Sequence, residues 1–195
     1  MRPPDTSCVT EPQIGDVLVV GSGKGWAARM IRVGQALRGQ PCTGNHVAIL
    51  HHFTDGVPWA LEGRPGGVGW VDARRYLRDK RTVTNVEQPK TTEQRAALAE
   101  VSKGLIGTKY DWQAIADDAL ESLGLQRLWT EDWDAKGVPG QVVCSSFAAW
   151  AYSKVELAHP RIGHERRVFP SDWSEFCFDS LWLKPPDPIL PGGQS

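Results

Sequence analysis

The chain has 195 residues, of which 41% are hydrophobic, enough to bury the core of one domain of ordinary size. Its 22 Lys and Arg and 23 Asp and Glu residues leave a net charge of −1 and are mixed along the chain. Composition therefore gives no indication of a nucleic-acid or membrane-surface partner. The four cysteines form no Cys-x-x-Cys pair, which argues against a zinc knuckle or a dense disulfide framework.

The two ends of the chain differ in composition from its middle. Residues 1–13 are polar and residues 185–195 are rich in proline and glycine, so we expect flexible tails around one domain spanning residues 14–184. No apolar run reaches the roughly 20 residues that cross a bilayer, and no segment is typical of a signal peptide. We expect a protein without stable membrane insertion, cytoplasmic or phage-associated. The richness in Ala, Gly, Arg and Trp fits a GC-rich bacterium or its phage.

The first part of the domain predicts strands and one helix. Residues 16–20 are a short apolar run closed by Gly21-Ser22-Gly23, which indicates a buried strand and a turn. Residues 46–53 and 58–62 predict a hairpin across Asp55-Gly56. The helix expected between the first two strands carries the apolar residues Ala27, Met30, Ile31 and Leu37.

An extended segment, a short helix and another strand are predicted next. Val68 and Trp70 suggest the extended segment, and Asp72 can cap a short helix that continues through Leu77. Residues 82–86 have the β-branched composition of a strand. The sheet is therefore expected to be mainly antiparallel.

The second part of the domain predicts helices. Thr91 and Gln94 have the spacing of a capping box, and apolar residues follow at helical intervals. A second helix is expected from about Asp111 to Leu123, and a third begins at Cys144 after a polar, Gly- and Pro-bearing connection. Together these elements predict an α+β fold in which an antiparallel sheet packs against helices.

Cys144 lies where the third helix begins. The helix places Ala148, Ala151 and Val155 on the same stripe, so another element can approach the cysteine closely. Unpaired backbone amides at a helix N-terminus favour the nucleophilic thiolate over the thiol. Most free cysteines are instead small buried hydrophobic residues. Position alone leaves both interpretations of Cys144 open.

A cysteine nucleophile needs a base within hydrogen-bond reach, and that base usually comes from elsewhere in the sequence. His46 begins a predicted strand, where an imidazole is held rigidly. His51 and His52 lie towards the turn, where a solvent-facing or structural role is expected. His159 and His164 lie in a loop and are expected to be exposed. His46 is therefore the predicted base.

Six short segments form an ordered pattern over most of residues 14–173. They are Ile14-Gly15-Asp16-Val17-Leu18, Asn45-His46-Val47-Ala48-Ile49, Ala60-Leu61-Glu62-Gly63, Gly107-Thr108-Lys109-Tyr110-Asp111, Val143-Cys144-Ser145-Ser146-Phe147 and Phe169-Pro170-Ser171-Asp172. The pattern resembles the circularly permuted branch of the papain-like, NlpC-type cysteine peptidases and amidases. In that branch the histidine strand precedes the cysteine helix, the reverse of papain.

The resemblance implies a permuted papain-like fold with Cys144 as nucleophile and His46 as general base. It also implies that Glu62 orients the imidazole and that Tyr110 shapes the site and supports the oxyanion. The long stretch between Tyr110 and Cys144 departs from the family's tighter spacing. No metal or organic cofactor is required. The residues expected to bind substrate are Ser22, Trp26 and Ser145.

The role of Glu62 depends on the register of the hairpin. With a two-residue loop, Leu50 pairs with Leu61 and Glu62 points away from His46. A three-residue loop, or a bulge near Pro58, places Glu62 on the same face as His46. The alternative for Glu62 is a solvated strand residue.

The glycine-rich run Gly21-Ser22-Gly23-Lys24-Gly25 resembles a phosphate-binding loop only superficially. A P-loop needs glycine where this chain has Leu18, and Ser or Thr where it has Gly25. We therefore expect this segment to border a substrate cleft instead of a nucleotide.

The predicted function is a cysteine hydrolase that attacks an acyl carbon, forms an acyl-enzyme and releases it to water, with the backbone amide of Cys144 stabilising the oxyanion. We expect a peptide or acylated substrate, and the bond predicted to be cleaved is an amide. Peptidoglycan peptides are the predicted substrate because much of the wider family acts on peptidoglycan. One alternative is an acyltransferase or a lipid- or ester-directed thioesterase of the lecithin:retinol acyltransferase type, which an apolar groove beside Cys144 would favour. Another is a non-catalytic binding or virion-structural module. The sequence does not indicate the oligomeric state.

Overall fold

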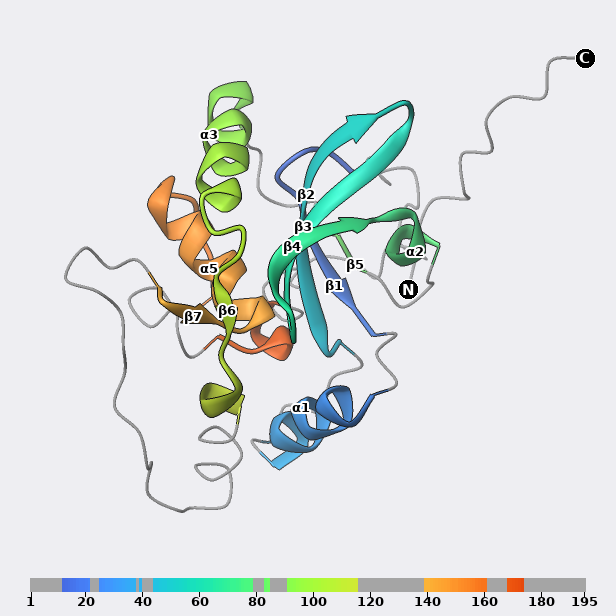
Figure 1. Cartoon of the computed structure of the whole chain (residues 1–195), viewed down its shortest axis with the longest axis vertical. Helices are drawn as coiled ribbons and strands as arrows, with labels where there is room; N and C mark the ends of the chain where they lie inside the picture. Colours follow the sequence, from blue (N-terminus) through green and yellow to red (C-terminus); the bar gives the residue numbers. More distant parts are fainter. Residues whose placement is uncertain are drawn as a thin grey trace, which may run out of the picture.

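The computed structural model describes residues 12–21, 25–37, 39, 44–78, 83–84, 91–115, 139–160 and 168–173. The predicted tails lie almost entirely outside these ranges, as do the predicted helix beyond residue 115 and most of the connection before Cys144. The described part is an α+β structure in which an antiparallel sheet packs against helices (Figure 1), as the sequence predicts.

One sheet organises the described part of the chain. Its strand order is β4-β3-β2-β1-β5, and every neighbouring pair is antiparallel. The predicted hairpin is present, and its turn is the two-residue Asp55-Gly56 with φ of 50° and 72°, the left-handed pair of a type I′ turn. The five strands are β1 (Val17–Val20), β2 (His46–Thr54), β3 (Val57–Arg64), β4 (Gly67–Asp72) and β5 (Val83–Thr84).

Helices surround this sheet within the described ranges. They include α1 (Trp26–Leu37), α2 (Arg74–Leu77), α3 (Thr92–Lys103) and α5 (Cys144–Lys154), and residues 112–115 and 170–173 are helical as well. The predicted capping box begins α3: the Gln94 amide donates to Thr91 Oγ1 at 3.2 Å, and the Thr91 amide donates to Gln94 Oε1 at 3.0 Å. No helix among the described residues is both long and apolar enough to cross a bilayer.

The central strands are buried on both faces because helices cover each side of the sheet. Val17, Val19 and their neighbours on β2 and β3 pack with α3 and α5. Leu18 and Val20 face the opposite way and pack with Tyr76 of α2. The alternation of side chains along each strand therefore divides the core into an α5 side and an α2 side.

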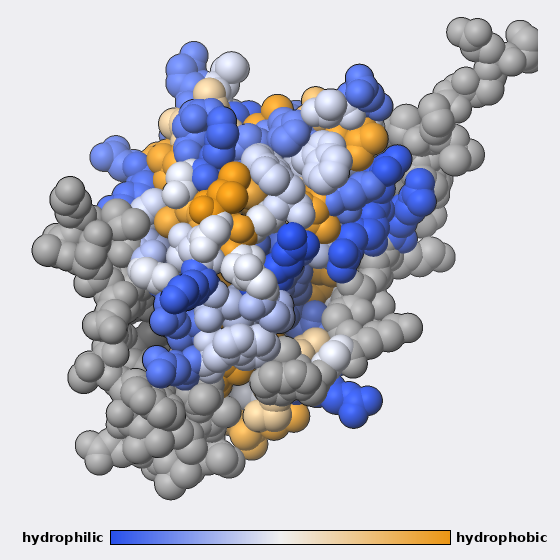
Figure 2. All heavy atoms as spheres, in the orientation of Figure 1, coloured by the Kyte–Doolittle hydropathy of each residue, from blue (hydrophilic) through white to orange (hydrophobic). Residues whose placement is uncertain are grey.

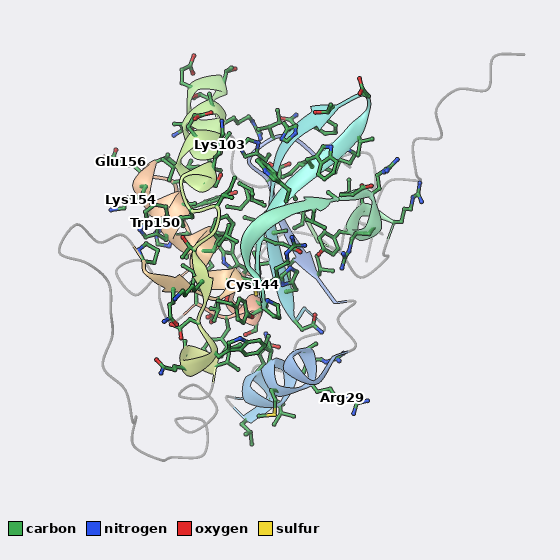
Figure 3. All side chains as sticks on the ribbon, in the orientation of Figure 1. Arg29, Lys103, Cys144, Trp150, Lys154 and Glu156 are labelled. Atoms are coloured by element: carbon green, nitrogen blue, oxygen red, sulfur yellow. The ribbon has the colours of Figure 1, made fainter. Side chains whose placement is uncertain are left out.

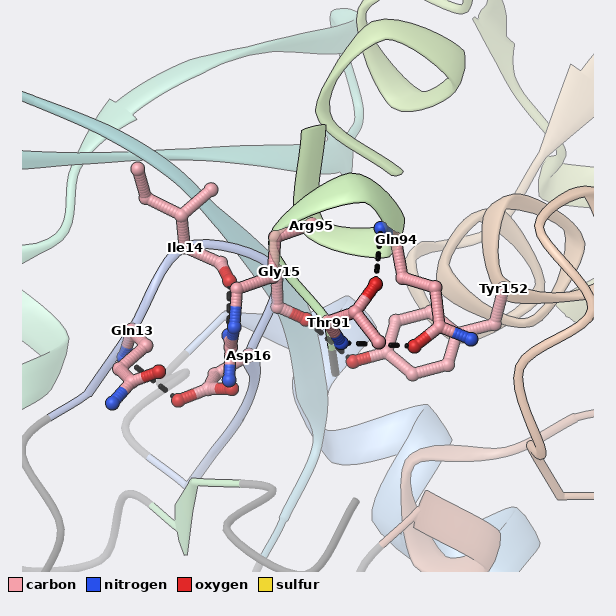
Figure 4. Close-up of polar contacts among 8 residues, drawn as sticks. All are labelled: Gln13, Ile14, Gly15, Asp16, Thr91, Gln94, Arg95 and Tyr152. Carbon is pink, nitrogen blue, oxygen red and sulfur yellow. Dashed lines mark hydrogen bonds and ion pairs between the residues drawn. The ribbon is translucent and has the colours of Figure 1, made fainter. Parts of the chain in front are cut away.

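A polar network fixes the start of β1 against α3 and α5 (Figure 4). The Tyr152 hydroxyl donates to the Gly15 carbonyl at 2.5 Å. The Arg95 guanidinium donates to the Ile14 carbonyl and lies 3.3 Å from Asp16 Oδ1. Because both contacts join the strand to a helix, they fix where α5 and its N-terminal cysteine lie relative to the sheet.

Candidate active site

Cys144 begins α5 as predicted, with its side chain on the sheet side of the helix (Figure 3). The cysteine is 1% exposed, and Ala148 and Ala151 on the same stripe are fully buried. Ser146 stabilises the helix start, since its Oγ accepts from the Val143 amide at 3.0 Å. The first amides of a helix have no acceptor within the helix, so the Cys144 N–H is available to a developing oxyanion.

Gly63 of β3 lets the start of α5 approach the sheet closely. A Cβ added at Gly63 would lie 3.3 Å from both Cα and N of Cys144. A side chain here would contact the cysteine backbone tightly, and that backbone would have to give by a few tenths of an ångström. The glycine therefore allows the close approach of the strand to the nucleophile.

His46, Glu62 and Tyr76 form a hydrogen-bonded chain on the α2 side of the sheet. His46 Nε2 lies 2.6 Å from Glu62 Oε2, and the Tyr76 hydroxyl donates to the same carboxylate oxygen. Glu62 is 3% exposed and Tyr76 is 2% exposed. With Nε2 held by the carboxylate, the imidazole lies close enough to the Cys144 side chain for the charge of that group to act on it.

A β-bulge brings Glu62 onto the face of His46. The loop has two residues, which by itself would turn Glu62 away, but the register shifts between Leu50 and His52. His51 is the extra residue, so Ala48 pairs with Glu62 and Leu50 with Ala60. The bulge lies on β2 and not near Pro58, yet it turns the Glu62 side chain to the face of His46, as a bulge near Pro58 would have done.

The groups around His46 favour its protonated form. Burial lowers the pKa of His46, but the charge and hydrogen bond of Cys144, followed by those of Glu62, outweigh burial and raise that pKa to about 10. At neutral pH the imidazolium is therefore the stable form. Its positive charge lies between the sulfur and the carboxylate.

The charge on Glu62 is maintained by the same contacts. Burial raises the pKa of this carboxyl, but hydrogen bonds and charge from His46, and the hydrogen bond from Tyr76, lower it overall. Burial and the neighbouring Glu62 charge raise the pKa of Tyr76, which keeps its hydroxyl protonated as a donor. The carboxylate is thus held ionised in a buried site.

Tyr110 reaches the nucleophile through a small parallel strand pair. The strand β6 (Lys109–Tyr110) pairs with β7 (Gln141–Val142), two residues before Cys144. Burial, then the charge of Cys144 and a hydrogen bond to it, raise the pKa of Tyr110, so its hydroxyl stays protonated. The structure therefore places all four predicted catalytic residues together, despite the long stretch between this tyrosine and the cysteine.

A pocket with about 420 Å³ of empty volume, part of it open to solvent, lies beside Cys144. Its walls come from α1, the segment after β6, the start of α5 and residues 168–170. Polar groups enter it from Tyr110, Cys144 and Ser145, and no described residue that lines it is charged. The other lining residues are Met30, Ile31, Gly34, Ile115, Val143, Val168, Phe169 and Pro170.

The three predicted substrate-binding residues have different positions. Ser145 lines the pocket, but its hydroxyl donates to the Val168 carbonyl at 2.5 Å and so holds residues 168–170 in place. Trp26 is the first residue of α1, whose later turns reach the pocket. Ser22 lies outside the described residues.

The other histidines that the structure describes lie away from this chain of contacts. His159 was expected to be exposed, and this is wrong: it is 4% exposed, with Nδ1 3.0 Å from the Pro160 carbonyl oxygen. His51 and His52 contact each other near the hairpin turn, with 3.0 Å between their Nδ1 atoms. In the described ranges no three potential metal ligands gather. The other three cysteines (Cys8, Cys42 and Cys177) and His164 lie outside those ranges.

Three features of the site are not predicted from the sequence: Tyr76, the close approach at Gly63 and the apolar pocket. Tyr76 lies inside the predicted short helix that ends at Leu77, and nothing local assigns it to the site, although a tyrosine facing a buried glutamate is a common donor. Gly63 follows Glu62 directly, and a glycine inside a strand is itself a signal of close backbone approach. The pocket has no local signal because its walls come from four separate segments.

Comparison with known proteins adds no family assignment. No family model matches the chain, and none of the curated proteins compared with it is significantly similar.

Proposed function

We propose that the protein is a cysteine hydrolase in which Cys144 forms an acyl-enzyme. The observation that carries this proposal is the position of His46, whose Nε2 lies 2.6 Å from the buried carboxylate of Glu62 and whose ring lies beside the Cys144 side chain. A nucleophile, a proton carrier and an orienting group in that order are the arrangement of a catalytic triad. The order of the histidine strand before the cysteine helix also supports the permuted papain-like fold.

Acylation begins from the thiolate–imidazolium pair. The Cys144 thiolate attacks the acyl carbon, and the carbonyl electron pair moves to the oxygen to form a tetrahedral oxyanion. The Cys144 backbone amide and the Tyr110 hydroxyl stand beside the sulfur as donors to that oxyanion. When the bond to the leaving group breaks, the His46 imidazolium gives its proton to that group, and a thioester remains on the cysteine.

Deacylation uses the same histidine in its other protonation state. Once the sulfur is acylated, its negative charge is gone, and the largest influence that raises the pKa of His46 disappears with it. The neutral imidazole can then accept a proton from water, which attacks the thioester and releases the acid. Glu62 and Tyr76 act through the histidine throughout, and we assign them positioning roles.

The direct experiment is capture of the acyl-enzyme. Incubation with an activated p-nitrophenyl ester, followed by acid quench and intact-mass measurement, should add one acyl mass on the peptide that carries Cys144. Cys144→Ala should remain unmodified and release no nitrophenol. An unmodified wild-type protein across amide, ester and thioester substrates would favour the non-catalytic binding or virion-structural module.

The ester- or thioester-directed alternative, with acyl transfer to an acceptor, gains support from the apolar lining of the pocket. The described lining residues are uncharged and mostly aliphatic or aromatic, and such a lining suits an aliphatic acyl group better than a charged cell-wall peptide. The peptidoglycan substrate therefore stays a prediction from the family resemblance alone.

Gly34 provides a test of the acyl group that the pocket accepts. A Cβ built at this residue meets no atom within 4 Å, so a side chain can begin there without a clash, and Gly34→Leu should take up part of the pocket. For an aliphatic acyl site, kcat/KM should rise with ester chain length in the wild type, and Gly34→Leu should lower it for long chains by roughly 10-fold while sparing acetyl esters. Ala36→Leu places the same leucine side chain on the exposed side of α1 and serves as control. Equal chain-length profiles in all three proteins would exclude the pocket as the acyl site.

A further inference from the structure

α1 carries an exposed apolar stripe beside its buried face. Met30, Val33 and Leu37 are 40%, 51% and 49% exposed, and their spacing of three and four residues places them along one side of the helix. Gly34 and Gln35 are buried on the other side. The apolar spheres at the lower edge of Figure 2 belong to this part of the molecule. A stripe of three large hydrophobic side chains on one short helix is an unusual arrangement for a water-facing surface.

The charges of α1 are all positive. Its twelve residues include Arg29 and Arg32 and no acidic residue. Arg29 is exposed and points away from the body of the protein (Figure 3). The sequence adds Lys24 before the helix and Arg38 directly after it. A helix with apolar side chains on one side and only cations beside them has the composition of helices that lie in the headgroup region of a membrane.

The stripe is continuous with the mouth of the pocket. Met30 is 40% exposed and also lines the pocket beside Cys144, and the neighbouring Ile31 and Gly34 line it as well. Whatever covers the stripe therefore lies at the entrance to the candidate active site. A lipid surface in that position would deliver an acyl chain directly into an apolar pocket.

We propose that α1 docks the protein on an anionic lipid surface and that the substrate is drawn from that surface. The apolar stripe enters the boundary between headgroups and acyl chains, while Arg29 pairs with lipid phosphates. The helix is about 18 Å long, enough to lie flat on a surface but too short to cross it. The mixed charge of the whole chain does not oppose this contact. Salt screening limits the electrostatic interaction with the lipid surface to the charges that lie close to that surface. The claim about substrate rests on the proposed function, whereas the docking does not.

Sedimentation with vesicles tests the docking directly. The full chain should bind vesicles of equal parts phosphatidylglycerol and phosphatidylcholine more tightly than vesicles of phosphatidylcholine alone. A double variant, Val33→Gln with Leu37→Gln, should lower partition onto the anionic vesicles roughly 10-fold or more. Arg29→Gln should lower it about 5-fold. The two glutamines replace half-exposed side chains on a helix that tolerates glutamine well, so folding should be preserved.

Phe53 provides the matched control. It is 50% exposed, like the stripe residues, but it lies beside the β2–β3 turn at the opposite end of the molecule from α1 (Figure 1). Phe53→Gln should bind vesicles as the wild type does. Equal binding by the wild type and the Val33–Leu37 double variant would overturn the proposal. So would a wild type that ignores vesicles and forms a dimer that the double variant dissolves, since the stripe would then pair two copies of the chain.

Activity measurements separate the docking from the chemistry. On a soluble short-chain ester the Val33–Leu37 double variant should match the wild type, and on the same ester group in anionic vesicles it should lose activity in proportion to binding. Cys144→Ala should bind vesicles normally. Normal vesicle binding without turnover of any ester by the wild type would leave the docking intact and defeat the proposed hydrolase. If the double variant turned over vesicle substrate as fast as the wild type, the hydrolase would stand and the docking would be defeated.

Discussion

His46 and His51 lie on the same strand, five residues apart, and their environments shift their pKa values in opposite directions. Burial lowers the pKa of both imidazoles. For His46, the charges of Cys144 and Glu62 exceed that effect and raise the pKa to about 10. For His51, the Ala99 carbonyl raises the pKa, but burial and the charge of neighbouring His52 prevail and the net shift is downward.

The difference shows that charged partners, more than burial, decide the protonation state of a histidine in this sheet. Nε2 of His51 donates to the Ala99 carbonyl oxygen at 3.0 Å, and a neutral acceptor stabilises a proton on imidazole only weakly. His46 contacts the ionised carboxylate of Glu62 and lies beside the Cys144 sulfur, which is the environment of a proton-transfer residue. Sequence position on a buried strand cannot distinguish the two.

The largest expected effect separates the two histidines by activity. His46→Gln should lower kcat/KM for the activated ester at least about 1,000-fold, because it removes both the proton donor and the proton acceptor. His51→Gln should change kcat/KM by less than about 2-fold. The pair of variants is compared by steady-state kinetics on the same ester. Similar losses in both would mean that the strand itself, and not the charged environment of His46, supports catalysis.

Replacing the carboxylate should make His46 resemble His51. Glu62→Gln keeps the size of the side chain but removes the charge, so kcat should fall roughly 100-fold. The pKa of His46 should fall below about 10, and the alkaline limb of the kcat/KM profile should move to lower pH because the imidazolium loses its proton sooner. An alkaline limb that does not move would show that Glu62 is a structural residue only.

Gly63→Ala tests whether the close approach of β3 to Cys144 matters. The added methyl group would lie 3.3 Å from the Cα and N atoms of the cysteine, so the backbone must shift. We expect a loss of about 1 to 3 kcal/mol in the free energy of unfolding, with a fall in kcat as the sulfur moves from His46. Gly66→Ala is the control, since a Cβ there meets no atom within 4 Å. If denaturant unfolding gave both variants the same free energy of unfolding as the wild type, the packing argument would be contradicted.

The smallest expected effect is on the pH dependence of stability. The folded-state pKa of His46 is raised, so its contribution is complete below the unfolded value of about 6.5 and is lost as pH rises towards about 10. The folded-state pKa of His51 is lowered, so this residue destabilises the fold as pH falls below about 6.5. Denaturant midpoints across pH should therefore flatten on the alkaline side in His46→Gln and on the acidic side in His51→Gln. The same change in both variants would refute the contrast.

Much of the fold can be predicted from the sequence because its signals are local. The apolar run of β1, the Asp55-Gly56 turn and the capping box at Thr91 each specify an element through neighbouring residues. The start of α5 at Cys144 was predicted in the same way.

The site was predicted less completely because its geometry depends on tertiary contacts. The facing of Glu62 depends on a bulge at His51, a position that no glycine marks in the sequence. Tyr76 contributes from a helix of only four residues, and the burial of His159 depends on distant packing. The apolar pocket requires the arrangement of α1 against residues 168–170, which no pattern in either segment indicates.

The central claim is that Cys144 and His46 form a reactive pair, and alkylation of the cysteine tests it most directly. Iodoacetamide labelling should be followed across pH by mass spectrometry of the peptide that contains Cys144, in the wild type and in His46→Gln. We expect the wild-type cysteine to react near neutral pH faster than an unperturbed thiol, and to lose that advantage in the variant. A cysteine that labels no faster than a free thiol near neutral pH, and equally in both proteins, would contradict the proposed catalytic pair.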